Sequence, residues 1–247
     1  MKKILSILFF IAGVISIIVD ARGQAFADFE TGAVFIGYND VRIPGDTGTF
    51  FSLNEDLEAQ PSPFVRLRAG YTINLRHNIS VLYAPLLIKS EGIINKQIYF
   101  NGVSFSAGTS LDAEYMFNSY RLTYRYDIVL KPTIEFGLGF TAKIRDAKIS
   151  LSDELITTAK TNVGFVPILN FRLHWLFNEN AGVLLYGDAL AAPQGRAEDV
   201  LLAFTYKLSD NLSIRGGYRI LEGGADNDEV YNFALINYAS IGLKYIF

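Results

Sequence analysis

The sequence predicts an all-β protein: a transmembrane up-and-down antiparallel β-barrel of about ten strands, or eight if two segments are only loop hairpins. Three observations predict this fold class. Apolar and charged side chains alternate with a period of two along much of the chain. Short and long connections between the predicted strands also alternate. The chain is 50% hydrophobic, yet no uncharged apolar run after Ala27 is long enough for a membrane-spanning helix.

The first 25 residues have the layout of a cleaved secretory signal peptide. Residues 1–3 are a short basic start, residues 4–19 are apolar and uncharged, and small residues at 23–25 or 25–27 offer cleavage sites. An uncleaved anchor is the alternative, but the apolar run is short for a spanning helix. We therefore expect export, cleavage, and one barrel domain over residues 26–247.

The predicted strands each approach or exceed the roughly 9–11 residues that cross a bilayer when tilted. They are expected at residues 28–40, 63–73, 78–88, 118–129, 133–146, 162–176, 181–191, 198–208, 212–221 and 230–247. Short turns are expected at 74–77, 130–132, 177–180 and 209–211, and long connections at 41–62, 89–117, 147–161, 192–197 and 222–229. In such a barrel the short turns face the periplasm and the long loops face outside.

The alternation also predicts which face is wet. Between residues 120 and 128, Tyr, Leu and Ile take the even positions, while Arg121, Arg125 and Asp127 take odd ones. Burying so many charges in the core of a soluble barrel would cost several kcal/mol each unless they were paired. They can instead line a hydrated or ion-paired lumen while the apolar face meets lipid. The predicted lumen-lining residues are Arg66, Arg68, Arg121, Arg125, Asp127, Glu135, Lys143, Arg145, Arg172, Lys207, Arg215 and Arg219.

The hairpin over residues 120–140 predicts one specific ion pair. Arg125 is expected opposite Glu135, because sliding the strands by one pair would place Asp127 against Glu135, like charge against like. The favoured role is structural neutralisation inside a narrow barrel. An ion-selective constriction is the alternative.

Aromatic residues lie near the end of every second predicted strand. All are on the apolar face near the same expected membrane boundary, where amphipathic rings are favourable. We therefore expect a periplasmic aromatic girdle of Tyr71, Tyr126, Trp175, Tyr206 and Tyr245.

The chain ends in IGLKYIF, in which Leu243, Tyr245 and the terminal Phe247 alternate in phase. This resembles the C-terminal signal of bacterial outer-membrane barrels, which typically ends in an aromatic residue and is read by the barrel-assembly machinery. Nearly all of residues 26–247 resemble the small outer-membrane β-barrel superfamily, without indicating one family within it. The resemblance implies a bacterial outer-membrane location, contact with outer-membrane lipids, and the assembly machinery as a partner during insertion.

The longest predicted outer loop contains a second hairpin. Residues 97–105 read QIYFNGVSF, and an Asn-Gly pair between apolar runs is a strong hairpin signal. We expect this hairpin to extend the barrel or to fold over its mouth. The long loops, and this hairpin first, are the candidates for binding an external ligand.

Several functional classes find no support, and we expect no catalytic, cofactor-binding or metal-binding residues. The chain has no cysteine, which excludes thiol catalysis and Cys-ligated zinc, and a net charge of −3 without a long basic run argues against nucleic acid. Residues 137–142 superficially fit a dinucleotide fingerprint but lack its strand–turn–helix context. His174 alternates with Arg172 near the periplasmic end, and no Ser or Asp is close in sequence.

The expected function is non-enzymatic: a structural barrel, a narrow passive channel or a surface-binding protein of the outer membrane. One alternative is an outer-membrane hydrolase acting on lipid or peptide, which would need a nucleophile or water-activating dyad at the outer rim. The other is an exported soluble lipocalin-like binder, whose apolar face would point inward and whose arginines would point outward.

Overall fold

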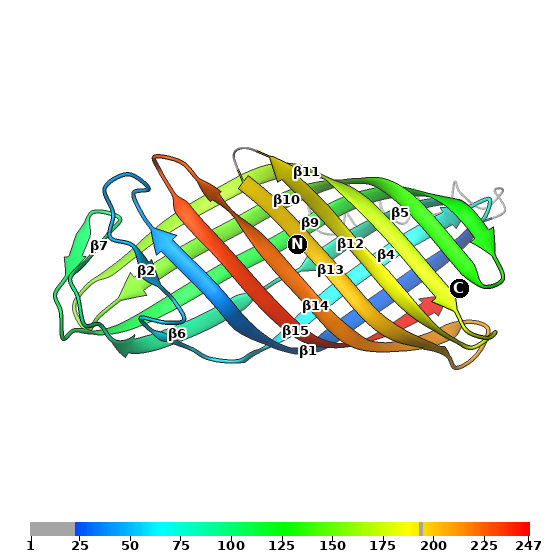
Figure 1. Ribbon diagram of the computed structural model, residues 1–247, viewed down its shortest axis with the longest axis horizontal. Coiled ribbons are helices and arrows are strands. Elements are labelled where there is room, and N and C mark those ends of the chain that lie inside the picture. Colours follow the sequence, from blue (N-terminus) through cyan, green and yellow to red (C-terminus); the bar gives the residue numbers. More distant parts are fainter. Residues whose placement is uncertain (1–22, 193–194) are drawn as a thin grey trace, which may run out of the picture.

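A computed structural model describes residues 23–192 and 195–247, which form a closed antiparallel barrel of 10 wall strands (Figure 1). Each wall strand pairs with its neighbours in sequence, and the last pairs with the first. The predicted fold class is confirmed, with ten strands rather than eight. The wall strands are β1 (Gly23–Arg42), β4 (Ser62–Ile73), β5 (His77–Ala84) continued by β6 (Leu87–Ile93), β9 (Ser110–Lys131), β10 (Ile134–Ser152), β11 (Thr157–Leu176), β12 (Ala181–Ala192), β13 (Gly195–Lys207), β14 (Leu212–Asp226) and β15 (Tyr231–Ile246).

One wall strand is interrupted. Both β5 and β6 pair antiparallel with β9, the first ending at the Ala84–Ser119 pair and the second starting at the Leu87–Met116 pair. Pro85 lies between them. Proline has no backbone N–H and cannot donate to the ladder, so the strand breaks here and then continues along the same neighbour.

Two predicted long connections are mostly strand, and those predictions are wrong. The connection expected at 147–161 is a turn at residues 153–156, and the one expected at 222–229 is a turn at 227–230. The reason is that both ladders run on toward the turns. The β10–β11 ladder continues without a shift to the Ser152–Thr157 pair, and the β14–β15 ladder continues to the Asp226–Tyr231 pair. Figure 1 shows that β10 and β11 reach much farther toward the β7 end than β12 and β13 do.

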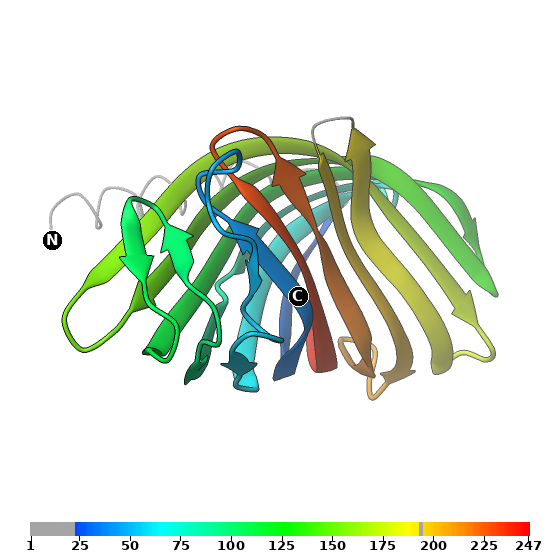
Figure 2. The ribbon, with the colours of Figure 1, turned by 60° about the vertical axis from the view of Figure 1, so that its left-hand side comes forward.

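The two ends of the barrel differ. At one end, which we call the turn end, short turns join the wall strands; the opposite end, the loop end, carries connections 43–61 and 94–109 (Figure 2). These two connections contain short strands, and we call them together the cap. The strands are β2 (Phe51–Ser52), β3 (Glu58–Ala59), β7 (Ile98–Phe100) and β8 (Val103–Phe105).

The predicted hairpin is present as β7–β8 and folds over the mouth. Asn101 and Gly102 have φ values of 47° and 87°, as a two-residue turn of this type requires. Phe100 is fully buried and meets Phe51 edge to face, with ring centroids 6.0 Å apart. The cap packs against inward-facing wall side chains in one apolar core, which includes Val34, Ile36, Tyr115, Ile149 and Ile236.

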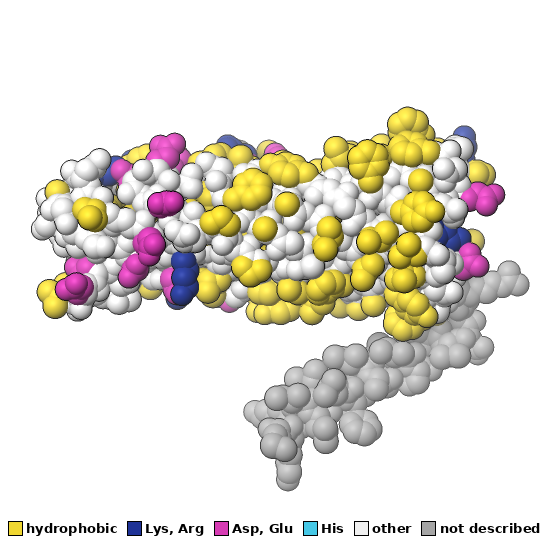
Figure 3. All heavy atoms as spheres, turned by 90° about the horizontal axis from the view of Figure 1, so that it is seen from below, with side chains coloured by type: hydrophobic (Ala, Val, Ile, Leu, Met, Phe, Trp, Pro, Cys, Tyr) yellow, Lys and Arg dark blue, Asp and Glu magenta, His cyan; other side chains and the backbone are white. Residues whose placement is uncertain are grey.

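The outer face of the wall is apolar. Phe204 is 71% exposed, and Phe140, Leu202 and Ile241 are also exposed. In the view of Figure 3, hydrophobic side chains cover the middle of the molecule, and charged ones gather toward its two ends. Within the described residues, no helix is long and apolar enough to cross a membrane.

Candidate functional site

The barrel interior is the candidate functional site, because the wall directs most of the charged side chains into it. It has three parts: a cavity of about 390 Å³ at the turn end, a charged cluster, and a cavity of about 770 Å³ toward the loop end. We call the two spaces the lower cavity and the upper cavity.

Eight charged side chains in mutual contact form the cluster, which we call the central network. Asp199 lies at its centre and contacts three guanidinium groups, those of Arg66 (2.8 Å), Arg121 (2.5 Å) and Arg219. The network contains four arginines and four carboxylates, so its formal charges cancel. Its members are Arg66, Arg121, Arg215, Arg219, Asp28, Glu30, Asp188 and Asp199.

The other carboxylates complete the network. Glu30 contacts both Arg219 (2.8 Å) and Arg215 (3.0 Å), and Asp28 contacts Arg215 at 2.7 Å. Asp188 contacts Arg121 and also accepts a hydrogen bond from Thr141 Oγ1 at 2.7 Å. The Arg121, Arg219, Asp188 and Asp199 side chains are each only 2% exposed. Ions this deeply buried are tolerated because Arg121, Arg219 and Asp199 each have two or more charged partners, and Asp188 has Arg121 together with a hydrogen bond from Asn170.

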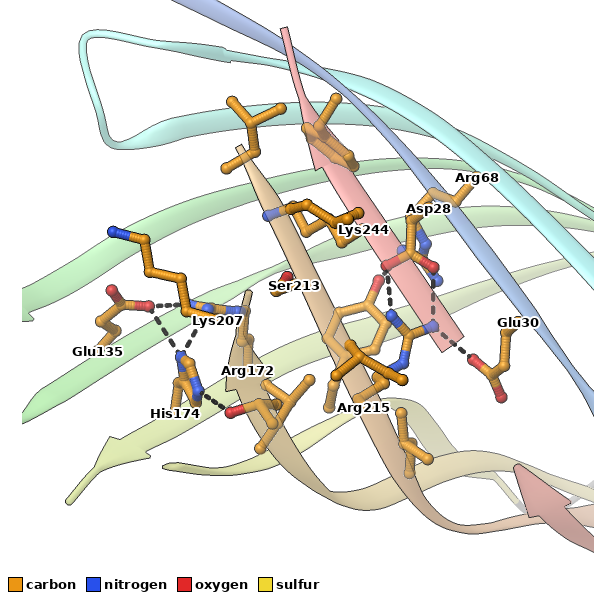
Figure 4. A pocket seen from close by; sticks show the side chains of 18 of the residues that line it. Asp28, Glu30, Arg68, Glu135, Arg172, His174, Lys207, Ser213, Arg215 and Lys244 are labelled. Atoms are coloured by element: carbon orange, nitrogen blue, oxygen red, sulfur yellow. Dashed lines mark hydrogen bonds and ion pairs between the residues drawn. The ribbon is translucent and has the colours of Figure 1, made fainter. Parts of the chain in front are cut away.

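The lower cavity opens at the turn end and is drawn in Figure 4. Turn residues such as Glu179 and Asn211 line its mouth, and Glu30 and Arg66 of the central network line its inner end. At the mouth, Lys207 donates a hydrogen bond to Asp210, which lowers the pKa of that carboxyl.

The predicted Arg125–Glu135 ion pair is wrong. Arg125 Nε bonds Asp127 Oδ1 on its own strand at 2.8 Å, and Glu135 pairs with Arg172 at 2.7 Å. The hairpin turns at Pro132 and Thr133, so Glu135 lies opposite Leu130 and Arg125 lies opposite Gly139. Beyond a β-bulge between Phe136 and Gly137, Gly137 faces Asp127. A Cβ on Gly137 would lie 2.2 Å from Asp127 Oδ1, so this glycine leaves room for the charged pair.

His174 and its hydrogen-bond partners lie on the wall of the lower cavity (Figure 4). His174 Nε2 is 2.8 Å from Thr205 Oγ1, and His174 Nδ1 is 3.4 Å from Glu135 Oε2. Hydroxyl, imidazole and carboxylate in this order resemble the relay of a nucleophilic hydrolase. The sequence reasoning missed Thr205, because that residue lies on β13, not near His174 in sequence.

The hydrogen bonds of His174 disfavour that chemistry. Arg172 Nη2 lies 3.2 Å from His174 Nδ1, and a guanidinium only donates, so a neutral His174 ring that accepts this bond carries its proton on Nε2. Nε2–H then donates to Thr205, whereas a general base would accept the proton of that hydroxyl. The cluster therefore fits a structural role.

We expect His174→Gln to leave a folded barrel, with a free energy of unfolding lowered by about 0.5–1.5 kcal/mol for the altered hydrogen bonds. Urea unfolding in lipid vesicles measures this change. We also expect no hydrolysis of short-chain phospholipids or peptide esters by the wild-type chain. Hydrolysis that both Thr205→Val and His174→Gln abolish, with the fold retained, would restore the hydrolase alternative.

The twelve predicted lumen-lining residues have different degrees of burial. Arg66, Arg121, Asp127, Lys143, Arg215 and Arg219 are buried, while Arg68, Arg125, Glu135, Arg145 and Arg172 are half-buried and Lys207 is exposed at the lower mouth. The sequence reasoning omitted the carboxylates of the central network. Charge balance was the available signal, because only two of the twelve predicted residues are acidic.

The predicted girdle residues lie near strand ends at the turn end. Tyr126, Trp175, Tyr206 and Tyr245 are exposed, and Tyr71 is half-buried. At the C-terminus, Leu243 and Phe247 are exposed as well, and the Phe247 ring meets Tyr245 with centroids 5.0 Å apart. These positions suit a membrane boundary and an assembly signal, which remain proposals.

Two further predictions concern what the structure describes only in part. Residues 1–22 of the predicted signal lie outside the described residues, and Gly23–Ala25 are the first three residues of β1. Across 23–192 and 195–247, no group of three or more His, Asp or Glu side chains is arranged to hold a metal ion.

No family model and no curated protein matches the sequence. Among solved structures, the outer-membrane protease OmpT from Escherichia coli is similar with a TM-score of 0.55 and 11% identity, over 91% of this chain and 97% of that one. Ail of Yersinia pestis, solved with the heparin analogue sucrose octasulfate, gives a TM-score of 0.41 and 10% identity over 91% and 99%. The Neisserial surface protein NspA gives 0.36 and 15% over 90% and 99%. The similarity to OmpT shows that the chain has the fold of a small outer-membrane β-barrel protein.

Proposed function

We propose that this protein is a non-enzymatic outer-membrane barrel with a sealed lumen, which binds a ligand toward its outer end and does not conduct solutes. The observation that carries the proposal is the central network. Its charges cancel, all its side chains except Asp28 are at most 9% exposed, and it lies between the two cavities. The apolar outer wall supports placement in a membrane, with lipid as the surrounding solvent.

The cap indicates which end of the barrel faces outside and which cavity holds the ligand. It closes the loop end with an apolar core and leaves the upper cavity beneath it, whereas the lower cavity opens among short turns. In bacterial barrels the longer loops face outside. The ligand site of the proposal is therefore the upper cavity, on the outer side of the network. The proposal includes a cleaved signal over residues 1–25 and insertion by the barrel-assembly machinery, read through the C-terminal Phe247.

In planar bilayers, we expect the purified chain to insert without producing single-channel current steps. The physical reason is that no hydrated path crosses a network whose side chains are packed in mutual contact. A porin measured in the same bilayers shows that insertion and detection work. Steady steps of uniform size from the wild-type chain would contradict a sealed lumen and favour the passive-channel alternative.

A further inference from the structure

The barrel wall has a window between β11 and β12. The two strands pair from the Leu176–Gly182 pair only as far as Leu169–Ala189. Beyond that point, β11 continues along β10 to Thr157, and β12 continues along β13 to Ala192. Pro167 lies two residues beyond the last pair, and its missing N–H removes one donor from the ladder. The facing strand edges are unpaired among the described residues.

An ion pair frames the far side of this window. Lys160 on β11 lies 3.2 Å from Glu229 in the turn between β14 and β15. The upper cavity reaches the opening, since its lining includes Phe165 and Pro167 from β11 and Leu190 from β12. Phe165 is 67% exposed and points outward, so the mouth of the window is apolar on its lipid side.

The central network and the cap narrow the axial routes into the upper cavity. The central network seals the side toward the turn end. On the other side, Asn101 ties the cap hairpin to both the first connection and β11, through bonds from its N to Ile43 O (2.9 Å) and from its Nδ2 to Ala159 O (3.0 Å). Exposed residues of the turn between β14 and β15, Asn227, Asp228 and Glu229, also line this cavity, and among the described residues the window is the route that reaches it through the barrel wall.

Two cations inside the cavity lack a carboxylate partner. Lys143 is 3% exposed, its Nζ lies 4.9 Å from the centroid of the Phe117 ring, and it forms no hydrogen bond or ion pair with the described residues. Arg145 bonds Asn162 through Nη2, but its buried Nε has no partner. Both residues line the upper cavity. A buried cation without a counter-charge is costly, and a bound anion would offset that cost.

The other cations of the cavity differ in this respect. Lys148, Lys160 and Arg196 each pair with a glutamate, at 2.9, 3.2 and 2.7 Å respectively. The positive charge without a carboxylate partner therefore lies on β10, at the consecutive inward positions 143 and 145.

We propose that the upper cavity binds the anionic head group, a carboxylate or phosphate, of a single-chain lipid that enters sideways from the outer leaflet through the β11–β12 window. The head group pairs with Lys143 and Arg145. The acyl chain leaves past Phe165, Pro167 and Leu190 toward the bilayer. The volume of about 770 Å³ lies within the range of small-molecule pockets. This inference rests on the proposed function, because a conducting lumen would leave no sealed cavity for the lipid.

The test titrates the full chain in neutral detergent with palmitate or 1-palmitoyl-lysophosphatidic acid, and counts bound lipid by native mass spectrometry. We expect one anionic lipid per chain and at least tenfold weaker binding by Lys143→Gln and Arg145→Gln. Lys207→Gln is the matched control, since it removes the same charge at the opposite end of the barrel, and it should bind as the wild type does.

Three results would overturn the inference. One is equal binding of hexadecanol or lysophosphatidylcholine, which lack a net negative charge. Another is inorganic phosphate displacing the lipid at equal concentration, which would indicate a site for a free anion. The third is absence of lipid binding while the bilayer recordings stay silent, in which case the sealed barrel stands and the lipid site falls. Current steps would overturn the proposed function itself.

The route has its own test, because the natural chain has no cysteine. Val166→Cys and Leu190→Cys place thiols on the two edges of the window, where a reducible bis-maleimide linker can join them. We expect the linked protein to load lipid at least tenfold more slowly, and reduction to restore the rate. Single-cysteine variants treated with the linker are the controls. An unchanged loading rate in the linked protein would show that the lipid enters elsewhere.

Discussion

Replacing Asp199 by asparagine is expected to lower the free energy of unfolding by about 3–5 kcal/mol, the cost of removing one partner from a buried ionic cluster. Asp199 contacts Arg66, Arg121 and Arg219, and all four side chains are no more than 5% exposed. The neutral amide leaves three guanidinium groups sharing fewer negative charges in a place that water does not reach. Urea unfolding in lipid vesicles, followed by fluorescence of the single Trp175, measures the loss.

The matched control is Asp210→Asn. Asp210 also accepts from a cation, Lys207, but its side chain is 94% exposed in a turn, so the same chemical change should leave the unfolding midpoint unmoved. Equal midpoints for Asp199→Asn and the wild type would show that water solvates the central network. A sealed lumen would then be untenable.

Placing arginine at Phe204 is expected to reduce insertion into lipid vesicles. Phe204 is 71% exposed on the outer face of β13, and its inward neighbour Ala203 is buried. A cation on a lipid-facing wall costs about 2–4 kcal/mol at the bilayer midplane and about 0–1 kcal/mol near the interfaces. Phe204 lies two residues from the proposed boundary residue Tyr206, so a cost between these values is expected. Folding is measured as the fraction of chain that acquires protease resistance after dilution from urea into vesicles.

Phe204→Leu is the control for this substitution, since it keeps the position apolar and should fold as the wild type does. The two variants behave differently only if the position meets lipid. A Phe204→Arg chain that folds as a soluble monomer without detergent would support the exported lipocalin-like alternative.

The alternation of side chains made the wall predictable. Leu202 and Phe204 lie on the exposed outer face of the wall, whereas Ala203 between them is buried inside the barrel. A sequence pattern with a period of two reports that difference directly. The Asn101–Gly102 turn was predictable for an equally local reason, because its two positive φ values suit few other residues.

Features that depend on contacts across the barrel were not predictable. The hairpin turns at Pro132 and Thr133, one residue later than the expected turn at 130–132 ends, and this places Glu135 opposite Leu130 rather than Arg125. The partners of Arg121 are Asp188 and Asp199, 67 and 78 residues farther along the chain. A period-two pattern gives the face of a residue but not its height, so it does not identify which charges meet.

The predicted end of β10 was wrong for a related reason. The residues beyond the predicted end of β10 still alternate, with Ile149 and Leu151 buried under the cap. This strand was expected to end at residue 146, before a long connection over residues 147–161. The ladder instead continues where one face is covered by protein, because a sheet needs only one buried face to persist.

The seam between β1 and β15 constrains the order of events during synthesis. Phe26 pairs with Ile246, and Phe247 N donates to Ala25 O at 2.9 Å, so the first wall strand waits for the last residues of the chain to arrive. Until then the nascent sheet carries two free edges, which are templates for aggregation. Loop closure over such a separation is also slow. On the proposed export route, the polypeptide would therefore need a chaperone in the aqueous compartment until its last strand is available to pair with the first.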